Sequence, residues 1–369
     1  MNIKFVDLAR QNKQLKPKLL PIIEKVIDDA DFILGKSLEK FEQNFAQYCG
    51  KKFAVGVNSG TDALKLALIA YGIGQDDEVI TAPNSYFSAT MVISQIGAIP
   101  VFVDIDPETF LLDFRKLKNA LTKNTKAIIP THLYGQVVDM DPIIAFAKKN
   151  NLIVIEDACQ AHGAEYKGKK VPIAETGVFS FYPGKNLGCF GDGGALVTDN
   201  PTIYEKILYL RNDGAKNKYI HEMFGFKSRL DNLQAAILGL KLSYLDKWNK
   251  KRIENAKKYS QLLGEIKNIK RPKMYNDRSY VYHLYVIECQ KRDALQDYLK
   301  KHGIETGIHY PIPTHLQKPY REMGYKKGDF PITEKKATSI LSLPMFPELK
   351  EEEIIYVVEK IKRFVLKNY

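Results

Sequence analysis

Short apolar runs alternate with amphipathic stretches between about residue 50 and residue 200. Each apolar run is rich in β-branched residues and ends in polar or small ones, which is typical of buried strands. The predicted strands are residues 53–60, 77–83, 99–106, 126–135 and 152–159. Helical periodicity lies between several of them, as in residues 61–72 and 140–151. This alternation predicts an α/β fold with a mostly parallel sheet covered by helices on both faces.

The pattern changes after residue 230. Apolar positions at helical spacing predict one long helix over residues 230–266. The predicted elements that follow are a strand at 279–289, a helix at 291–303, a proline-rich loop at 307–320 and a final lysine-rich amphipathic helix. This order predicts a second, smaller α+β domain, so we divide the chain into residues 1–245 and residues 246–369.

The composition is that of a globular protein with a sizeable core. Of the 369 residues, 45% are hydrophobic and 27% are charged, and the formal net charge is +12. A positive charge favours anionic partners. However, the lysines are spread through helical surface runs, without an arginine-rich arm or zinc-finger spacing. The pattern therefore favours a phosphorylated metabolite over nucleic acid, and a solvated lysine-rich surface explains most of the excess.

Simple sequence patterns predict the cellular location of the protein and the redox state of its cysteines. The residues MNIKFVDLARQNKQ contain no apolar signal segment, and no apolar run approaches the ~20 residues that span a bilayer. We therefore expect a cytoplasmic protein without membrane association. The four cysteines are far apart and form no C-x-x-C pattern, which predicts reduced thiols without a disulfide or a metal site. They are Cys49, Cys159, Cys189 and Cys289.

The first segment with candidate chemistry is NSGTDAL, residues 58–64, where a predicted strand gives way to a helix. Backbone N–H groups at the start of a helix point at an anion, and the helix dipole favours a negative charge there. Gly60 and Thr61 are therefore candidate phosphate ligands. The alternative is an ordinary helix N-cap without a ligand.

The second segment is IVIEDACQAHGA, residues 153–164. Asp157 lies at the polar end of a strongly apolar strand, where a carboxylate must be paired because leaving it buried and bare is costly. An aspartate that caps the following turn is the alternative. Gln160 and His162 follow directly, and a lone histidine in such a place is more often a hydrogen-bonded part of the scaffold.

The third segment is FSFYPGKNLGCFGDGGALVT, residues 179–198. It places Lys185 after a Pro-Gly turn, and Ser180 alternates with two phenylalanines. A lysine with its ordinary pKa of ~10.4 is protonated and is a poor nucleophile. Burial lowers that pKa and frees the amine for Schiff-base chemistry. The glycines of GDGGA let the backbone approach a ligand closely. The alternative is a surface lysine on a turn.

Together the three segments supply what pyridoxal phosphate requires. The lysine joins the aldehyde of the cofactor, and the acid pairs with the pyridinium nitrogen and keeps it protonated. The amides at the helix start bind the phosphate. Tyr86, in TAPNSYFSAT after another strand end, offers an aromatic ring to lie on the cofactor.

The sequence resembles the DegT/DnrJ/EryC1/StrS family of nucleotide-sugar aminotransferases, which belongs to the fold-type I pyridoxal-phosphate class. The resemblance covers nearly the whole chain. It rests on the segments FVDLARQ, FILGKSLEKFEQNFAQYCG, AVGVNSGTDAL, EDACQAHGA, SFYPGKNLGCFGDGGA, SRLDNLQAA and GIHYPIPTHLQ, in the family's order. It implies an aspartate-aminotransferase-like fold in which residues 1–245 bind the cofactor. It also implies an obligate homodimer with shared active sites.

The resemblance assigns roles by position. Lys185 matches the catalytic lysine that binds the cofactor, Asp157 the partner of the pyridinium nitrogen, and Gln160 the contact to the ring hydroxyl. Tyr86 matches the stacking aromatic. The residues that match phosphate ligands are Gly60, Thr61 and Ser180.

One position departs from the family pattern. Members usually place an asparagine two residues before the arginine of the SRLD-type segment, where it reaches the phosphate in the neighbouring subunit. This chain has Lys227 there. A lysine can reach a phosphate as a point charge, and the alternative is that Lys227 is merely exposed.

The resemblance also implies a reaction. Retention of Lys185 favours transamination over the dehydration carried out by members with a histidine in its place. The implied donor is L-glutamate, which becomes 2-oxoglutarate, and pyridoxamine phosphate is the second form of the cofactor. The dispersed cysteines do not supply the grouping that holds an iron–sulfur cluster in one dehydratase branch.

The motifs QAHGA and GIHYP are similar to those of the branch that acts on dTDP-3-keto-6-deoxyhexoses. The implied product is a dTDP-3-amino-3,6-dideoxyhexose for lipopolysaccharide, another glycan or a natural product. The alternatives are UDP-2-acetamido-3-keto-glucuronate, a dTDP-4-keto sugar, and a non-catalytic regulator that binds pyridoxal phosphate. The expected substrate contacts, each of which could instead be a packed aromatic or a scaffold histidine, are His162, Tyr182, His309, Tyr310, His315 and the partner subunit's Tyr219.

Overall fold

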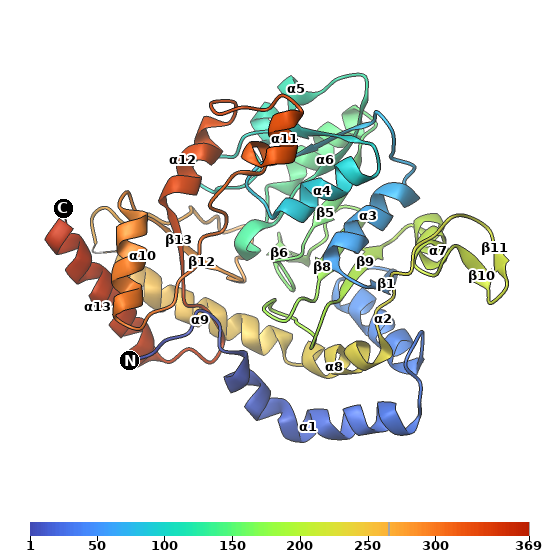
Figure 1. The fold of residues 1–369 in the computed structure, drawn as a ribbon, viewed down its shortest axis with the longest axis horizontal. Helices are drawn as coiled ribbons and strands as arrows, with labels where there is room; N and C mark the ends of the chain where they lie inside the picture. The colour runs from blue at the N-terminus through green and yellow to red at the C-terminus, as the bar shows by residue number, and fades with distance from the viewer. Residues whose placement is uncertain (265, 369) are drawn as a thin grey trace.

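A seven-stranded mixed sheet lies at the centre of the computed structural model, which describes residues 1–264 and 266–368 (Figure 1). The strand order is β1-β9-β8-β5-β4-β2-β3, and neighbouring strands are parallel except in the two pairs that include β9. The bounds are β1 Phe53–Val57, β2 Glu78–Thr81, β3 Ile99–Phe102, β4 Thr125–Ile129, β5 Ile153–Asp157, β8 Thr176–Ser180 and β9 Gly194–Thr198. The predicted α/β class and mostly parallel sheet are confirmed.

Helices cover both faces of this sheet (Figure 1). They are α2 Lys36–Tyr48, α3 Gly60–Ala70, α4 Phe87–Gln95, α5 Leu117–Ala120, α6 Met140–Lys149, α7 Pro201–Leu210 and α8 Asn232–Leu242, while α1 Leu8–Asp28 packs against α8. Because side chains alternate along a strand, each strand contributes to two separate apolar layers. Val55 and Leu196 pack with α3, α4 and α7 on one face, and Phe179 and Val197 pack with α2, α6 and α8 on the other.

The sequence predicts one continuous helix over residues 230–266, and this prediction is wrong. The structure has two helices here, α8 and α9 (Leu245–Leu263), with a break at Ser243 and Tyr244. Ser243 Oγ donates a hydrogen bond of 2.7 Å to the Leu240 carbonyl oxygen. Such a local bond from side chain to backbone competes with the regular hydrogen bonds of a helix.

The strand predicted for residues 279–289 is shorter in the structure. Only β12, Tyr285–Glu288, is a regular strand. Tyr282 has a left-handed φ of 47°, which interrupts the extended backbone before β12.

A smaller α+β part follows α8. β12 pairs with β13 (Ile340–Leu343) in a two-stranded antiparallel sheet. The helical segments of this part are α9, α10 Arg292–Lys301, η3 Thr314–Leu316, α11 Lys318–Glu322, α12 Pro331–Ser339 and α13 Glu351–Asn368. The first residues of the chain also lie here, because Ile3 forms a parallel bridge with Ile304. The division of the chain near residue 245 stays a prediction.

The chain also contains several short strands and helical turns. A hairpin of β10 (Ala215–Asn217) and β11 (Ile220–His221) projects from the body of the molecule beside α7 (Figure 1). The remaining short elements are β6 Glu165–Tyr166, β7 Lys169–Lys170, η1 Phe114–Lys116 and η2 Leu133–Gly135.

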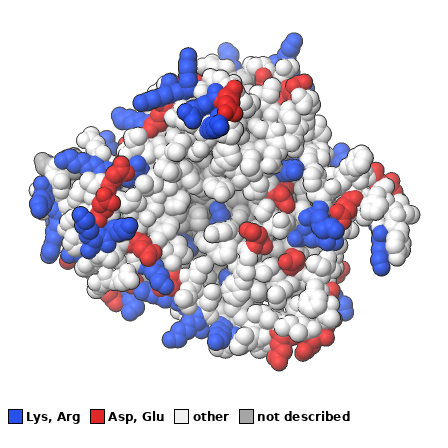
Figure 2. Space-filling view, viewed as in Figure 1, with Lys and Arg blue, Asp and Glu red and all other residues white. Residues whose placement is uncertain are grey.

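Charged side chains are scattered over the face seen in Figure 2, with acidic groups among the basic ones and a largely uncharged hollow at the centre. This distribution agrees with a solvated lysine-rich surface. Among the described helices, none combines the length and the apolar character that a membrane span requires. Within the described residues, the four cysteines form no disulfide.

Candidate active site

A cavity of about 740 Å³ lies at the carboxyl ends of the parallel strands. The segments that follow β1, β2, β4, β5 and β8 all contribute to its wall, because parallel strands end at the same edge of a sheet. The sequence-predicted residues that line it are Gly60, Thr61, Tyr86, Asp157, Gln160, Ser180, Tyr182, Lys185, His309 and Tyr310. The structure therefore brings together the three segments singled out in the sequence.

The wall that follows β1 is the N-terminus of α3. Ser59 Oγ caps the helix by accepting the N–H of Asp62 at 3.1 Å. The N–H groups of Gly60 and Thr61 belong to the first turn of α3, where the backbone N–H groups have no carbonyl acceptor within the helix. A Cβ on Gly60 would lie 2.7 Å from Ser180 Cβ. Close backbone packing therefore leaves a polar cradle suited to a phosphate.

Two hydrogen bonds fix the carboxylate of Asp157 at the end of β5. Its Oδ1 accepts the backbone N–H of Cys159 at 3.1 Å, and its Oδ2 accepts Thr131 Oγ1 at 3.3 Å. Only 7% of Asp157 is exposed, so the carboxylate is held at the cavity wall with little access to bulk water. Sequence reasoning missed Thr131, although its position after the neighbouring strand β4 identifies it in retrospect.

Gln160 forms another side of the cavity. Its Oε1 accepts the N–H of Tyr134 at 2.7 Å, and its Nε2 donates to the Tyr310 hydroxyl at 3.3 Å. The ring of Tyr310 lies 5.7 Å from that of Tyr86, measured between centroids, and 59% of Tyr86 is exposed. An amide and two aromatic rings are thus arranged where a flat ligand can lie against them.

Lys185 enters the cavity from the turn between β8 and β9. Its backbone N–H donates to the Tyr182 carbonyl oxygen at 2.9 Å, which closes the turn. Burial lowers the pKa of the Lys185 amine, while the neighbouring Cys159 and Asp157 act in the opposite direction. An amine with a lowered pKa loses its proton more readily, as a nucleophile or general base must.

These residues fit pyridoxal phosphate group by group. The N-terminus of α3 and Ser180 would hold the phosphate, Asp157 would pair with the ring nitrogen, and Lys185 would join the aldehyde. The close approach at Gly60 is the structural feature that supports the fit, because a Cβ there would collide with Ser180 and Cys159, so only glycine lets these segments converge at the start of α3. These assignments stay predictions.

Two histidines line the cavity. His309 stacks on Phe5 at 5.6 Å between centroids, and its Nδ1 lies 2.9 Å from Ser342 Oγ. Burial and the positive charge of Lys185 lower the pKa of His309 to about 4. The same two causes lower the pKa of His283. Sequence reasoning missed His283, and the signal for it was a polar residue inside the apolar run SYVYHLYVIEC.

Two other predicted histidines lie outside the cavity. His162 is fully buried and packs against Phe179 and Phe181, with centroid distances of 5.3 and 5.9 Å. His315 is also fully buried, and its Nε2 lies 3.0 Å from Glu334 Oε1. Neither residue lines the cavity within one chain, and a role for either in substrate binding stays a prediction.

Tyr219 and Lys227 lie at the molecular surface. Tyr219 is 81% exposed. The side chain of Lys227 is 69% exposed and lies 3.6 Å from Asp213. Neither residue lines the cavity of its own chain, so a role in binding would require a second subunit.

The fold and this cavity define an enzyme of the fold-type I pyridoxal-phosphate class. The model of the DegT/DnrJ/EryC1/StrS aminotransferase family matches residues 13–362, and the chain belongs to this family. Solved structures similar to this chain include forms with pyridoxamine phosphate and with pyridoxal phosphate. The protein is therefore a pyridoxal-phosphate-dependent sugar aminotransferase.

Individual relatives differ in the activity that their names describe. The solved structure of DesV from S. venezuelae is 40% identical, with a TM-score of 0.97 and coverage of 99% of this chain and 98% of that chain. A dTDP-3-amino-3,6-dideoxy-α-D-galactopyranose transaminase from Aneurinibacillus thermoaerophilus is 45% identical over 98% of this chain and 99% of the relative.

Two further relatives carry different names. A UDP-N-acetyl-3-dehydro-α-D-glucosamine 3-aminotransferase from Acidithiobacillus ferrooxidans is 40% identical over 98% of this chain and 97% of the relative. A protein from Geobacillus stearothermophilus named pleiotropic regulatory protein is 47% identical over 99% of both chains.

Substitution of Gly60 tests the phosphate cradle. In Gly60→Val, the new Cβ would lie 2.8 Å from Cys159 Sγ as well as against Ser180. We expect the Kd for pyridoxal phosphate to rise by about tenfold or more, because charge-assisted contacts to the phosphate are lost. An absorbance titration measures this. Gly239→Ala is the control, since a Cβ there meets nothing within 4 Å. Unchanged affinity in Gly60→Val would contradict the assignment.

The burial of His162 predicts a pH dependence of stability. Burial, with the charge of Lys185, lowers the pKa of His162 to about 3. Below its ordinary pKa of ~6.5, the unfolded chain binds a proton here and the folded chain does not, so folding stability falls with falling pH.

Between pH 7 and pH 5, we expect the unfolding free energy of the wild type to fall by about 2 kcal/mol more than that of His162→Gln. Chemical denaturation at the two pH values measures the difference. His221→Gln, which changes an exposed histidine, should behave as the wild type. Equal pH dependence in all three proteins would show that His162 is not buried in its neutral form.

Proposed function

We propose that this enzyme transfers the amino group of glutamate to the 3-keto carbon of a dTDP-3-keto-6-deoxyhexose. The observation that carries the proposal is the meeting of Gln160, His309 and Tyr310 with Lys185 in one cavity, because Gln160 belongs to QAHGA, and His309 and Tyr310 belong to GIHYP, the two motifs that are similar to the dTDP-3-keto branch. The relative named as a dTDP-3-amino-3,6-dideoxy-galactopyranose transaminase, at 45% identity, supports the same choice.

The chain supplies acid–base chemistry to the reaction. When bound, pyridoxal phosphate supplies an aldehyde that accepts an amino group and a ring that withdraws electrons from the reacting carbon. The Lys185 amine, with its lowered pKa, would take a proton from the donor carbon and return it one position away. The Asp157 carboxylate would hold the proton on the ring nitrogen, since Thr131 and the Cys159 N–H fix its two oxygens.

The opposite side of the cavity would receive the sugar. Tyr182 is 60% exposed and lines the cavity together with His309 and Tyr310. Because its pKa is about 4, His309 is neutral near pH 7 and can donate or accept a hydrogen bond without introducing a charge. A neutral donor of this kind suits a sugar hydroxyl or ketone better than a phosphate.

Two alternatives have support among the relatives. The relative named as a UDP-N-acetyl-3-dehydro-glucosamine aminotransferase, at 40% identity, favours a UDP-linked 3-keto sugar as the second candidate. The relative named as a regulatory protein belongs to another class of function. The lysine and carboxylate in this cavity favour catalysis, since a binding module does not need an acid–base amine.

We further propose a homodimer with shared active sites. Tyr219, in the turn of the hairpin that projects from the body (Figure 1), is 81% exposed, and Phe224, just after β11, is 100% exposed. Large aromatic side chains in such positions are typical of a surface that a second subunit covers. A partner seated there would bring its own Tyr219 and Lys227 toward a cavity that neither residue reaches within one chain.

A substrate panel tests the proposed reaction. The reverse direction avoids unstable keto sugars, so the panel uses 2-oxoglutarate with dTDP-3-amino, dTDP-4-amino and UDP-3-amino sugars. We expect kcat/KM to be about tenfold or more higher for the dTDP-3-amino-3,6-dideoxyhexose, because the other sugars leave buried polar groups unpaired. A higher value for the UDP-linked sugar would contradict the proposal. Glutamate alone should change the absorbance spectrum of the cofactor from that of the pyridoxal form to that of the pyridoxamine form, a conversion that a regulator need not carry out.

Substitution of an exposed aromatic tests the dimer. We expect sedimentation velocity to show a wild-type dimer and to show that Phe224→Asp raises the dissociation constant roughly tenfold or more, since a charge replaces a buried aromatic contact. Leu366→Asp is the control, because Leu366 is 76% exposed on α13, away from the hairpin. A monomeric wild type, or a Phe224→Asp protein that dimerises as tightly, would contradict the proposal.

A further inference from the structure

The loop that carries Lys185 is long and rich in glycine. β8 ends at Ser180 and β9 begins at Gly194, so residues 181–193 lie between two strands without belonging to either. Four of these residues are glycines, which leave the backbone free to adopt many conformations. The ends of the strands alone therefore do not determine where the Lys185 amine lies. Contacts to other parts of the molecule are needed to hold it.

The residue that follows Lys185 makes such contacts. Asn186 is 3% exposed, and its Nδ2 donates two hydrogen bonds, to Asn249 Oδ1 at 2.9 Å and to the Val281 carbonyl oxygen at 3.0 Å. Asn249 lies on α9, and Val281 lies in the segment before β12, so both acceptors belong to the smaller part of the chain. A buried amide with two acceptors is costly to displace, because the displaced groups lose their partners.

Asn249 also bonds to the segment that follows β5. Its Nδ2 donates to the carbonyl oxygen of His162 at 2.7 Å, and His162 lies two residues after Gln160. The directions of the two bonds are compatible, because Asn249 uses its Nδ2 for His162 and its Oδ1 for Asn186. One side chain, 5% exposed, thus links the two segments that carry most of the candidate cofactor contacts.

The backbone leaves room for this link. Gly163 has a left-handed φ of 76°, and a Cβ there would lie 2.9 Å from Asn249 Nδ2 and would collide with the Tyr48 hydroxyl. The left-handed region favours glycine, and a side chain at residue 163 would push Asn249 away from its acceptor. The motif QAHGA therefore supplies the glycine that lets Asn249 approach, as well as Gln160 in the cavity wall.

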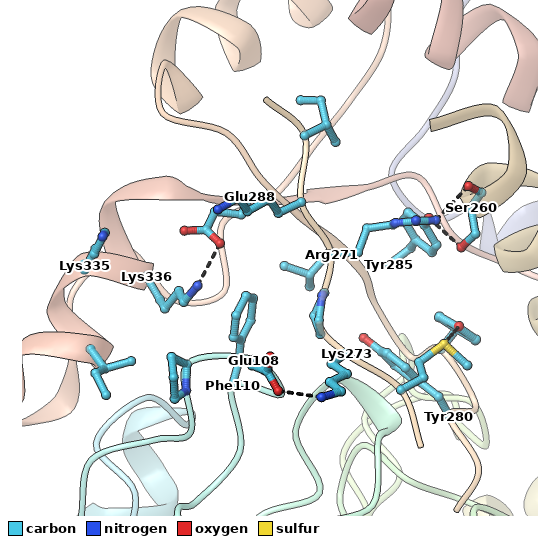
Figure 3. A pocket seen from close by; sticks show the side chains of 18 of the residues that line it. Glu108, Phe110, Ser260, Arg271, Lys273, Tyr280, Tyr285, Glu288, Lys335 and Lys336 are labelled. Atoms are coloured by element: carbon cyan, nitrogen blue, oxygen red, sulfur yellow. Dashed lines mark hydrogen bonds and ion pairs between the residues drawn. The ribbon is translucent and has the colours of Figure 1, made fainter. Parts of the chain in front are cut away.

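Two other polar residues of α9 bond to segments outside the cavity of Lys185. Asn255 Nδ2 donates to the Phe346 carbonyl oxygen at 3.0 Å. Near the end of α9, Ser260 Oγ lies 3.0 Å from the Tyr285 hydroxyl, beside a separate cavity of about 1050 Å³ (Figure 3). Among the described residues, that cavity shares no lining residue with the first one. Asn249 differs from these two residues in the segments that it joins.

We propose that Asn249 is a positioning residue of the active site, which acts through Asn186 to hold Lys185 relative to the segment that carries Asp157 and Gln160. The inference rests on the proposed attachment of the cofactor to Lys185. Asn249 does not line the cavity, so it acts only through other residues. The effect is large for a physical reason, because a misplacement of about 1 Å between reacting groups can cost roughly 10²-fold in rate.

The rate at which pyridoxal phosphate attaches to Lys185 tests the proposal without turnover. Cofactor-free enzyme is mixed with pyridoxal phosphate, and the change in absorbance is followed. We expect the rate constant to fall about tenfold or more in Asn249→Ala, because the amine is held less often where it can react. We expect kcat to fall as well and the KM for glutamate to change little. Asn255→Ala is the matched control, since it also loses an amide–carbonyl hydrogen bond on α9, and it should attach the cofactor at the wild-type rate.

A second variant separates this link from a general loss of stability. Asn186→Ala breaks the link from its other end and leaves the bond from Asn249 to His162 intact, so it tests the proposal even if Asn249→Ala does not fold. Because the two residues share one hydrogen bond, the factors by which the single variants slow attachment should not multiply in the double variant. Thermal melting, measured in parallel, should show that Asn255→Ala loses stability without slower attachment.

Two results would overturn the proposal. Attachment in Asn249→Ala or Asn186→Ala as fast as in the control, or factors that multiply in the double variant, would show that this pair does not position Lys185. If borohydride reduction still placed the wild-type adduct on Lys185, the proposed function would stand without this inference. A wild-type adduct on another lysine would overturn both.

Discussion

Adjacent parallel strands β5 and β8 bring the Asp157 carboxylate and the Lys185 amine to one edge of the sheet. The rest of the site depends on this constraint. The amine loses its proton readily only if it is buried, and the carboxylate tolerates burial only if hydrogen bonds hold it. Strand pairing brings Asp157 to the edge of the sheet where β8 ends, and the turn that follows β8 then places Lys185 in the same cavity. A cofactor with a basic nitrogen and an aldehyde can then be held between them.

The two parts of the chain meet around this edge. The large part supplies the strand ends and the N-terminus of α3, while His309 and Tyr310 come from the smaller part. Hydrogen bonds join the two contributions, from Gln160 Nε2 to the Tyr310 hydroxyl at 3.3 Å and from the Tyr134 hydroxyl to the His309 carbonyl oxygen at 2.6 Å. The groups expected at the sugar are thereby positioned relative to the groups expected at the cofactor.

Sequence patterns predicted the features that depend on local periodicity and on strand ends. The alternation of strands and helices predicted the sheet, and the positions of Asp157 and Lys185 at strand ends predicted that they would meet. Features set by individual contacts could not be predicted. The break at Ser243 depends on one side-chain hydrogen bond, and the late start of β12 within the predicted strand depends on the φ of Tyr282. The burial of His162 depends on tertiary packing that a motif does not encode.

The covalent attachment of pyridoxal phosphate to Lys185 tests the central claim most directly. Purified enzyme with the cofactor is reduced with borohydride, digested and mapped by mass spectrometry. The account predicts one cofactor adduct, on the peptide that contains Lys185. An adduct on another lysine, or a protein that takes up no cofactor in excess pyridoxal phosphate, would contradict it.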